Sequence, residues 1–162
     1  LKAAALTPMI DPNTQEELLI PHHVLEAVAK IGPELSQEFY RALASSKDAT
    51  ARGAAAAQLA AAPPADRARN VIILKSLLTD DVTVIRVSAA VGLILLEDNS
   101  GESVILDALN AKDSWELRTV LAQLARTTNV NQRRFCRSRI EIIVKDQTVH
   151  EETRRAASRL LQ

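Results

Sequence analysis

The sequence predicts an all-α fold made of repeated helical hairpins, and three observations indicate this fold class. Alanine and aliphatic residues supply most of the apolar content, whereas aromatic residues make up only 2 % of the 162 positions. Apolar residues recur at helical spacing between short turns that contain Gly, Pro, Asp or Asn. An arginine followed three and four residues later by small or apolar residues returns at Arg52, Arg86, Arg118 and Arg154. The intervals of 34, 32 and 36 residues are typical of helical solenoids.

Residues 1–20 are expected to form a segment of their own before the repeats. The opening LKAAAL has the composition of the end of a preceding helix, which Thr7-Pro8 stops. A short helix is expected before Pro21. We therefore predict that the repeat domain runs over residues 21–162.

The repeat domain is predicted to hold four hairpins and one further helix. The hairpins are expected at approximately residues 22–45, 48–78, 82–110 and 115–145, and the last helix at 149–161. Thr148 and Glu151, at capping-box spacing, predict where that helix starts. Its apolar face has no partner helix, and a solenoid normally closes with a polar cap. We therefore expect the chain to belong to a longer repeat array or to a larger parent protein.

The central hairpin, residues 82–110, shows why the hairpins must stack. Its first helix, over 82–96, has apolar residues on all sides of the axis and must be covered on most of them. Its second helix, over 103–110, is amphipathic and half exposed. One hairpin therefore cannot bury its own apolar surface, and it needs neighbours on both sides, as a solenoid repeat does.

The central hairpin also resembles a known family through an acidic turn followed by an arginine and an alanine pair, and the chain adds a small-residue turn upstream. These features are Asp80-Asp81, Arg86 and Ala89-Ala90, and the turn Ile31-Gly32-Pro33. The family is that of the HEAT-like repeats found in phycobilisome lyases and many bacterial scaffold proteins. The resemblance covers roughly residues 21–162, although Leu121 and Ser158 depart from the alanine pair. It implies a right-handed α-solenoid whose second helices line a concave binding face. The resemblance is specific for this architecture and not for an activity.

The four repeated arginines have two interpretations. They could form a row of cations for an extended acidic ligand. We favour a structural role, because an aspartate recurs four to eight residues before each arginine and buried charges are normally paired. The expected partners in the turns between repeats are Asp48, Asp80 or Asp81, Asp113 and Asp146.

The sharper candidate for a binding site is QRRFCRSRIEIIVK, residues 132–145. On one α-helix, Arg133, Arg134 and Arg137 would point away from an apolar arc. They could then bind a phosphate, an acidic peptide or an anionic cofactor. The competing interpretation, which we favour, is a solvated basic helix face.

Trp115, the only tryptophan, is a second candidate binding residue. It is predicted in the first turn of its helix, off the apolar stripe. Beside arginines, a partly exposed tryptophan could be an interaction hot spot. We favour instead a tryptophan that covers the seam between two repeats.

Charge and composition exclude several classes of function. Residues 1–111 carry 9 Lys/Arg and 14 Asp/Glu, whereas residues 112–162 carry 11 and 6, so a basic C-terminal third balances an acidic remainder. A chain of zero net charge is not an electrostatic nucleic-acid binder as a whole. The single Cys136 excludes an internal disulfide and is expected to behave as a small hydrophobe. Adjacent His22 and His23 point in different directions on a helix, and we expect no metal site.

The function we expect is that of a non-catalytic scaffold that binds another protein or another domain of its parent chain. An alternative implied by the resemblance is an accessory protein or enzyme of the bilin-lyase type, which would bind an anionic cofactor. Nucleic-acid binding through the basic C-terminal end is a third hypothesis, disfavoured because base stacking needs several aromatic residues. We expect no catalysis and no cofactor, since the sequence has no phosphate-binding loop, GxSxG or HExxH pattern. No apolar run is long enough to span a membrane, and the compartment stays open.

Overall fold

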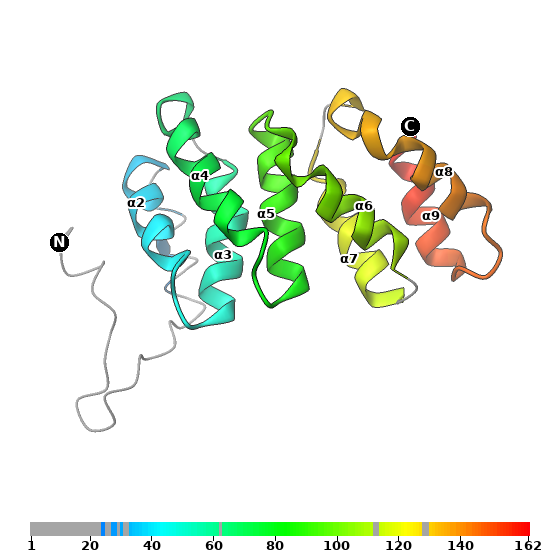
Figure 1. Ribbon diagram of the computed structural model, residues 1–162, viewed down its shortest axis with the longest axis horizontal. Coiled ribbons are helices and arrows are strands. Elements are labelled where there is room, and N and C mark those ends of the chain that lie inside the picture. The colour runs from blue at the N-terminus through cyan, green and yellow to red at the C-terminus, as the bar shows by residue number, and fades with distance from the viewer. Residues whose placement is uncertain are drawn as a thin grey trace, which may run out of the picture.

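The computed structural model describes residues 24, 27–28, 30, 33–61, 63–111, 114–127 and 130–162. In these ranges the chain forms eight α-helices, three 3-10 helices and no strand, which confirms the all-α prediction (Figure 1). The helices are α2 (Pro33–Leu43), α3 (Ala49–Leu59), η1 (Pro64–Asp66), α4 (Arg67–Leu77), α5 (Thr83–Leu95), η2 (Asn99–Gly101), α6 (Glu102–Asn110), α7 (Ser114–Leu124), η3 (Val130–Cys136), α8 (Arg137–Lys145) and α9 (Glu151–Arg159). The predicted N-terminal segment, residues 1–20, lies outside the described residues.

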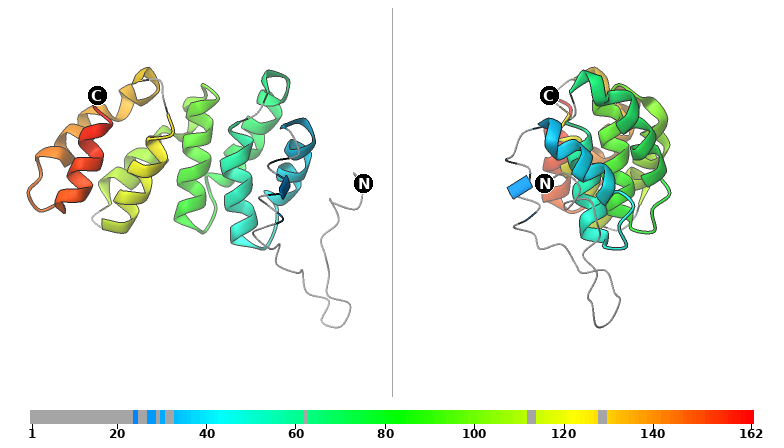
Figure 2. Two further views of the ribbon diagram at one scale, coloured as in Figure 1. Left: turned by 180° about the vertical axis from the view of Figure 1, so that it is seen from behind. Right: turned by 90° about the vertical axis from the view of Figure 1, so that its left-hand side faces the viewer.

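The helices lie side by side in a row, from α2 at one end to α8 and α9 at the other (Figure 1). Helices α3, α5, α7 and α9 pack against one another in succession, and they form the front of the molecule in the left view of Figure 2. Helices α4, α6 and α8 follow them in the chain and pack beside them. Helices α3, α5, α7 and α9 therefore lie in one layer, and α4, α6 and α8 lie beside it.

Helix α5 is the centre of the molecule, as its apolar pattern predicts. It packs against α3, α4, α6 and α7. Ile85 and Leu93 of α5 join the core shared with α2, α3 and α4, whereas Val87 and Ile94 join the core shared with α6 to α9. The two cores therefore meet across a single helix, which must stay in place for either of them to be closed.

Small residues let neighbouring elements approach α5 closely. A Cβ atom added at Gly92 would lie 3.2 Å from Leu74 and 3.3 Å from Ala60. A Cβ atom added at Gly101 would lie 2.6 Å from the Cα atom of Ala90. The backbone of η2 therefore rests directly on α5, and this contact places the start of α6.

A buried polar network joins α2, α3 and α4. Asn70 is fully buried; its Oδ1 accepts a hydrogen bond from Nε of Arg41 at 2.9 Å. Its Nδ2 donates to Oε1 of Gln37 at 2.6 Å and to the Leu59 carbonyl at 2.9 Å. Arg41 is also ion-paired with Asp66. Both ends of the Asn70 amide are thus satisfied, which a buried amide requires.

The predicted single helix over the second half of the fourth hairpin is wrong. The 3-10 helix η3 precedes α8, which begins only at Arg137. Gln132 donates from Nε2 to the carbonyl of Ile94 at 3.1 Å, and Cys136 is buried in the core. These contacts hold the segment across the end of α5, and an apolar pattern alone does not separate a short 3-10 helix from an α-helix.

The last helix also starts later than its capping-box pair predicts. Oδ1 of Asp146 accepts from the backbone N–H of Thr148 at 2.9 Å and from its Oγ1 at 2.7 Å. Thr148 is thereby held in a turn of the type that aspartate side chains form. His150 caps α9 instead, since its Nδ1 accepts from the N–H of Glu152 at 3.4 Å.

Candidate functional site

Arg52, the first of the repeated arginines, joins two successive hairpins. Its Nε lies 2.6 Å from Oδ2 of Asp80, and its Nη2 lies 3.1 Å from the other oxygen of that carboxylate and 2.9 Å from Oδ1 of Asp81. Its Nη1 donates to the carbonyls of Ser46 and Lys47, both at 3.0 Å. The side chains of Arg52 and Asp80 are only 15 % and 5 % exposed. A two-pronged, half-buried pair of this kind fixes the geometry of the turn between repeats.

The pairing shifts the ionisation of Asp80. The hydrogen bond from Arg52 holds the pKa of this carboxyl at about 2, against the opposing effect of burial, and the N–H of Val82 adds to the shift at 2.9 Å. The same contact raises the pKa of Arg52. The carboxylate is therefore charged at neutral pH, and its charge is used inside the fold.

Two further arginines of the series repeat part of this arrangement. Nη1 of Arg86 donates to the carbonyls of Asp80 and Asp81 at 2.8 and 3.1 Å, six and five residues earlier, as Arg52 does in its own turn. Arg154 donates to the Asp146 carbonyl at 3.4 Å and to Gln147 at 3.0 Å. The contacts support the structural interpretation, with turn carbonyls as frequent acceptors.

Within the described residues, the structure does not show the predicted pairs of Asp48 with Arg52 or of Asp113 with Arg118. Asp48 caps α3, accepting from the N–H of Thr50 at 2.8 Å, and is not the partner of Arg52. Asp113 lies outside the described residues, and Arg118 lies exposed on α7. A row of free cations is thus not what Arg52, Arg86 and Arg154 provide.

The three arginines of the basic stretch do not share one outward face. Arg134 and Arg137 are exposed, and Arg137 pairs with Glu141 at 3.1 Å. Arg133 is only half exposed, and its Nε is buried with no hydrogen-bond partner among the described residues. The reason is the change of helix type, because a 3-10 helix turns every three residues and not every 3.6.

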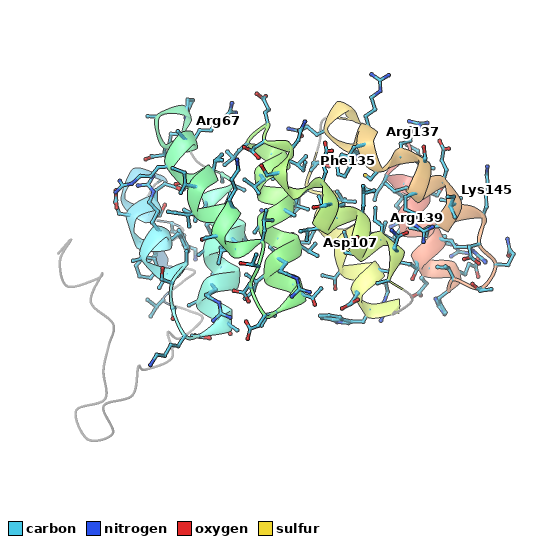
Figure 3. All side chains as sticks on the ribbon, viewed as in Figure 1. Arg67, Asp107, Phe135, Arg137, Arg139 and Lys145 are labelled. Carbon is cyan, nitrogen blue, oxygen red and sulfur yellow. The ribbon has the colours of Figure 1, made fainter. Side chains whose placement is uncertain are left out.

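Helix α8 carries the remaining cations of the basic stretch. Arg137, Arg139 and Lys145 lie along it, and Phe135 lies before its start (Figure 3). Arg139 is half buried and donates from Nε to the Leu109 carbonyl of α6 at 3.3 Å. This hydrogen bond gives Arg139 a partner inside the fold.

Trp115 does not lie beside the arginines of η3. It is 51 % exposed in the first turn of α7, whereas η3 follows the other end of that helix. The helix is 11 residues long, or about 16 Å at the usual rise. The predicted hot spot and the predicted basic site are therefore separate surfaces.

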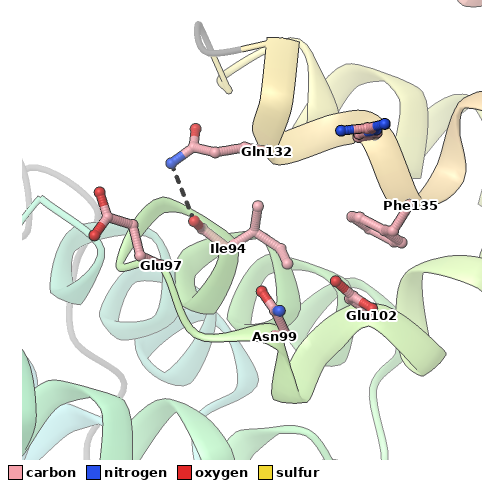
Figure 4. Close-up of a pocket in the computed structure, with 7 residues that line it drawn as sticks. Ile94, Glu97, Asn99, Glu102, Gln132 and Phe135 are labelled. Atoms are coloured by element: carbon pink, nitrogen blue, oxygen red, sulfur yellow. Dashed lines mark hydrogen bonds between the residues drawn. The ribbon is translucent and has the colours of Figure 1, made fainter.

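A cleft lies between η3 and the junction of α5 with α6 (Figure 4). We call it the η3 cleft; its volume is about 520 Å³. It is lined by Ile94, Glu97, Asn99, Glu102, Gln132, Arg134 and Phe135. Only Arg134 among these was a candidate from the sequence, because the lining comes from two segments that are far apart in the chain.

The wall formed by the end of α5 is held by a specific C-terminal cap. The N–H groups of Glu97 and Asp98 donate to the carbonyls of Ile94 and Leu93 at 3.0 and 2.9 Å, a Schellman arrangement. Glu97 has a φ of 61°, in the left-handed region where glycine is usual. This backbone conformation directs the chain from α5 into η2 and α6, along the edge of the cleft.

Asp98 secures the same junction. Its carboxylate accepts from the N–H of Ser100 at 2.9 Å and pairs with Lys75 at 2.9 Å. Hydrogen bonds from Ser100 and then Lys75 hold its pKa at about 2. The Asp98 charge is therefore neutralised behind the cleft and does not act within it.

The two walls of the cleft carry opposite charges that do not meet. Glu97 forms an exposed ion pair with Arg67 at 3.3 Å. Glu102 is half buried in the first turn of α6 and has no ion pair in the described part of the chain. Arg134 on the η3 wall is exposed and likewise has no ion pair among the described residues. The cleft therefore exposes one unpaired carboxylate and one unpaired guanidinium to a ligand.

Cys136 lies close by but cannot act as a nucleophile in this state. It is fully buried, and its Sγ lies 3.2 Å from the carbonyl of Arg133. Burial raises the pKa of the thiol to about 11. The thiolate is the reactive form, so the residue packs as a small apolar group, as the sequence predicts.

No group of three or more His, Cys, Asp or Glu side chains that could hold a metal ion is found within the described ranges. His22 and His23 lie outside them. Among the described helices, none is long and apolar enough to cross a membrane.

Comparison with known proteins gives no match: no family model, no curated protein and no solved structure matches this chain. The resemblance to HEAT-like repeats stays a prediction from the residues quoted above.

Proposed function

We propose that this chain is a non-catalytic protein-interaction module, that its hairpins form a right-handed HEAT-like α-solenoid, and that it binds another protein or another domain of its parent chain. The observation that carries the proposal is a repeated exposed position. The sixth residue of each second helix, α4, α6 and α8, is solvent exposed. These residues are Ile72, Asp107 and Ile142, and the two isoleucines are 70 % and 53 % exposed.

Single exposed apolar residues are common on protein surfaces and need no explanation. Ile72 and Ile142 differ from such residues because they occupy equivalent positions on helices of the same layer. The resemblance assigns these second helices to the concave binding face of a solenoid. A partner bound along that face would bury both isoleucines and contact Asp107 between them. The isoleucines would supply buried apolar area and Asp107 would position the partner, and no catalytic group is needed.

The test is capture of a partner from the lysate of the source organism, with mass spectrometry to identify what is bound. The test variant is Ile72→Glu with Ile142→Glu, and the matched control is Ser76→Glu with Ser138→Glu, two exposed residues of the same helices. Wild type and control should retain the partner, whereas the isoleucine variant should lose it with unchanged circular dichroism. Equal retention by all three proteins would remove the second-helix face from the proposal.

The same preparation separates the other hypotheses. Visible absorbance of a co-purified pigment would favour an anionic-cofactor function. Binding of duplex DNA that weakens with added salt would favour a nucleic-acid function.

A further inference from the structure

We propose that the η3 cleft binds a short extended segment of the partner protein that carries a basic side chain beside a large apolar one. The inference rests on the proposed interaction function and adds to it a second surface and the chemistry of the partner. The volume of the η3 cleft, about 520 Å³, is within the range of about 300–1,000 Å³ that is usual for ligand sites. A few side chains of a peptide would therefore fill it.

The apolar part of the cleft lies between its two walls. Phe135 of η3 and Ile94 of α5 border the same space from opposite sides (Figure 4). Phe135 is half buried, so part of its ring is available to a ligand. A leucine-sized side chain placed between them would bury apolar surface on both sides, which is the main source of affinity in such sites.

The charges of the lining favour a cation over an anion. Glu97 and Glu102 contribute two carboxylates, whereas Arg134 is the one arginine of the basic stretch that lines the cleft. Glu102 is half buried and unpaired within the described residues, so a bound ammonium or guanidinium would give it the partner that the fold withholds. The ring of Phe135 adds a favourable surface for the same cation.

Arg134 and the two amides of the lining set how the segment lies. Arg134 repels a cation from the η3 wall and so directs it toward Glu97 and Glu102. Gln132 uses its Nε2 on the Ile94 carbonyl, which leaves its Oε1 to accept a peptide N–H. Asn99 is exposed and offers both a donor and an acceptor. An extended peptide, whose backbone groups are unpaired, matches these amides.

The experiment is an NMR titration of the isotope-labelled chain with two blocked tripeptides, acetyl-Lys-Leu-Gly-amide and acetyl-Glu-Leu-Gly-amide. The lysine peptide should shift the amide signals of Ile94, Glu97, Glu102 and Phe135, and the glutamate peptide should shift them less. Glu102→Gln should weaken binding of the lysine peptide by about two- to fivefold, the range of a partly exposed ion pair. Glu152→Gln makes the same chemical change at an exposed residue of α9 outside the cleft lining and should leave the affinity unchanged.

Arg134→Glu provides a test by gain of affinity. The residue is exposed and makes no ion pair among the described residues, so the variant should fold as wild type does. It adds a third carboxylate to the lining and should strengthen binding of the lysine peptide by about two- to fivefold. A gain cannot be attributed to loss of folded protein.

Three results would overturn the inference. The first is a preference for the glutamate peptide, which would make the cleft an anion site. The second is an equal loss in Glu102→Gln and Glu152→Gln, which would show general electrostatic attraction. The third is no shift with either peptide. In each case the isoleucine variants would still test the proposed interaction function, so the two failures can be told apart.

Discussion

The turn between α4 and α5 and the η3 cleft both concentrate charge, yet they treat it in opposite ways. At the turn, Arg52 engages two carboxylates and two carbonyls, and Asp80 is almost fully covered. At the cleft, Glu102 and Arg134 lie on opposite walls without ion pairs in the described residues. The difference indicates that the N-terminal charges hold the hairpins together, whereas the cleft charges remain available for a ligand. Stability and binding should therefore depend on different residues.

The largest effect is expected at the buried network that joins α2, α3 and α4. Asn70→Ala should lower the free energy of unfolding by about 3 kcal/mol, because Arg41, Gln37 and the Leu59 carbonyl each lose a partner in a buried site. Asn110→Ala, at an exposed position of α6, is the control and should change it by less than about 0.5 kcal/mol. Urea denaturation followed by circular dichroism measures both. Similar values for the two variants would show that the network adds little.

The second effect tests the pairing at the turn directly. Arg52→Ala should lower the free energy of unfolding by about 2 kcal/mol, since it leaves the covered carboxylate of Asp80 without its cation. Peptide binding at the η3 cleft should be unchanged, because the turn lies outside its lining. Urea denaturation and the NMR titration provide the two measurements. A stable variant with altered peptide binding would reverse the comparison.

The third effect is the pH dependence of that pairing. Because the pKa of Asp80 is lowered to about 2 in the fold, the charged form stabilises the fold fully above the unfolded pKa of about 3.9. The contribution, about 1 kcal/mol after solvent screening, is lost as the pH falls from about 4 to about 2. The loss of free energy of unfolding caused by Arg52→Ala should therefore be smaller at pH 2.5 than at pH 5. Urea denaturation at the two pH values measures it. A constant cost would mean that Arg52 stabilises the fold through its carbonyl contacts alone.

The fourth effect separates stability from binding at one residue of the cleft. Glu97→Gly should stabilise the fold by about 0.5 kcal/mol, since relief of its left-handed backbone exceeds the loss of an exposed ion pair with Arg67. The same variant should weaken binding of the lysine peptide, because it removes a carboxylate from the lining. Thermal denaturation and the NMR titration measure the two changes. Loss of stability without loss of binding would show that Glu97 serves the helix end and not the ligand.

The sequence predicts the paired region far better than the cleft. The sequence predicts a structural role for Arg52 but assigns it the preceding Asp48 as its partner. In the structure Asp48 caps α3, and Arg52 pairs with Asp80 and Asp81, 28 and 29 positions later. The backbone carbonyls that accept from Arg52, those of Ser46 and Lys47, could not be predicted, because every residue has a carbonyl group. The structural role of the series could be predicted from the sequence, but most of its partners could not.

The cleft could not be predicted because it depends on how distant segments meet. Gln132 reaches the Ile94 carbonyl across 38 positions, and this contact accompanies a 3-10 helix where the apolar pattern predicts an α-helix. Once η3 replaces that helix, Arg133 turns inward and only Arg134 reaches the cleft. Glu97 stands at the position after a helix end where glycine is usual. Its left-handed φ of 61° is visible only in the structure, because a glutamate at this position does not indicate that backbone angle.

The smallest effect on stability completes the comparison with Arg52. Arg134→Ala should change the free energy of unfolding by less than about 0.5 kcal/mol, because the side chain is exposed and its removal leaves no buried charge unpaired. Binding of the lysine peptide should rise by up to about fivefold, because the nearest repelling charge is removed. Arg52→Ala would then lower the free energy of unfolding by about 2 kcal/mol without changing peptide binding. Arg134→Ala would increase peptide binding with almost no change in stability. If Arg134→Ala were as destabilising as Arg52→Ala, the guanidinium would belong to the fold, and the cleft would lose its charge asymmetry as a basis for recognition.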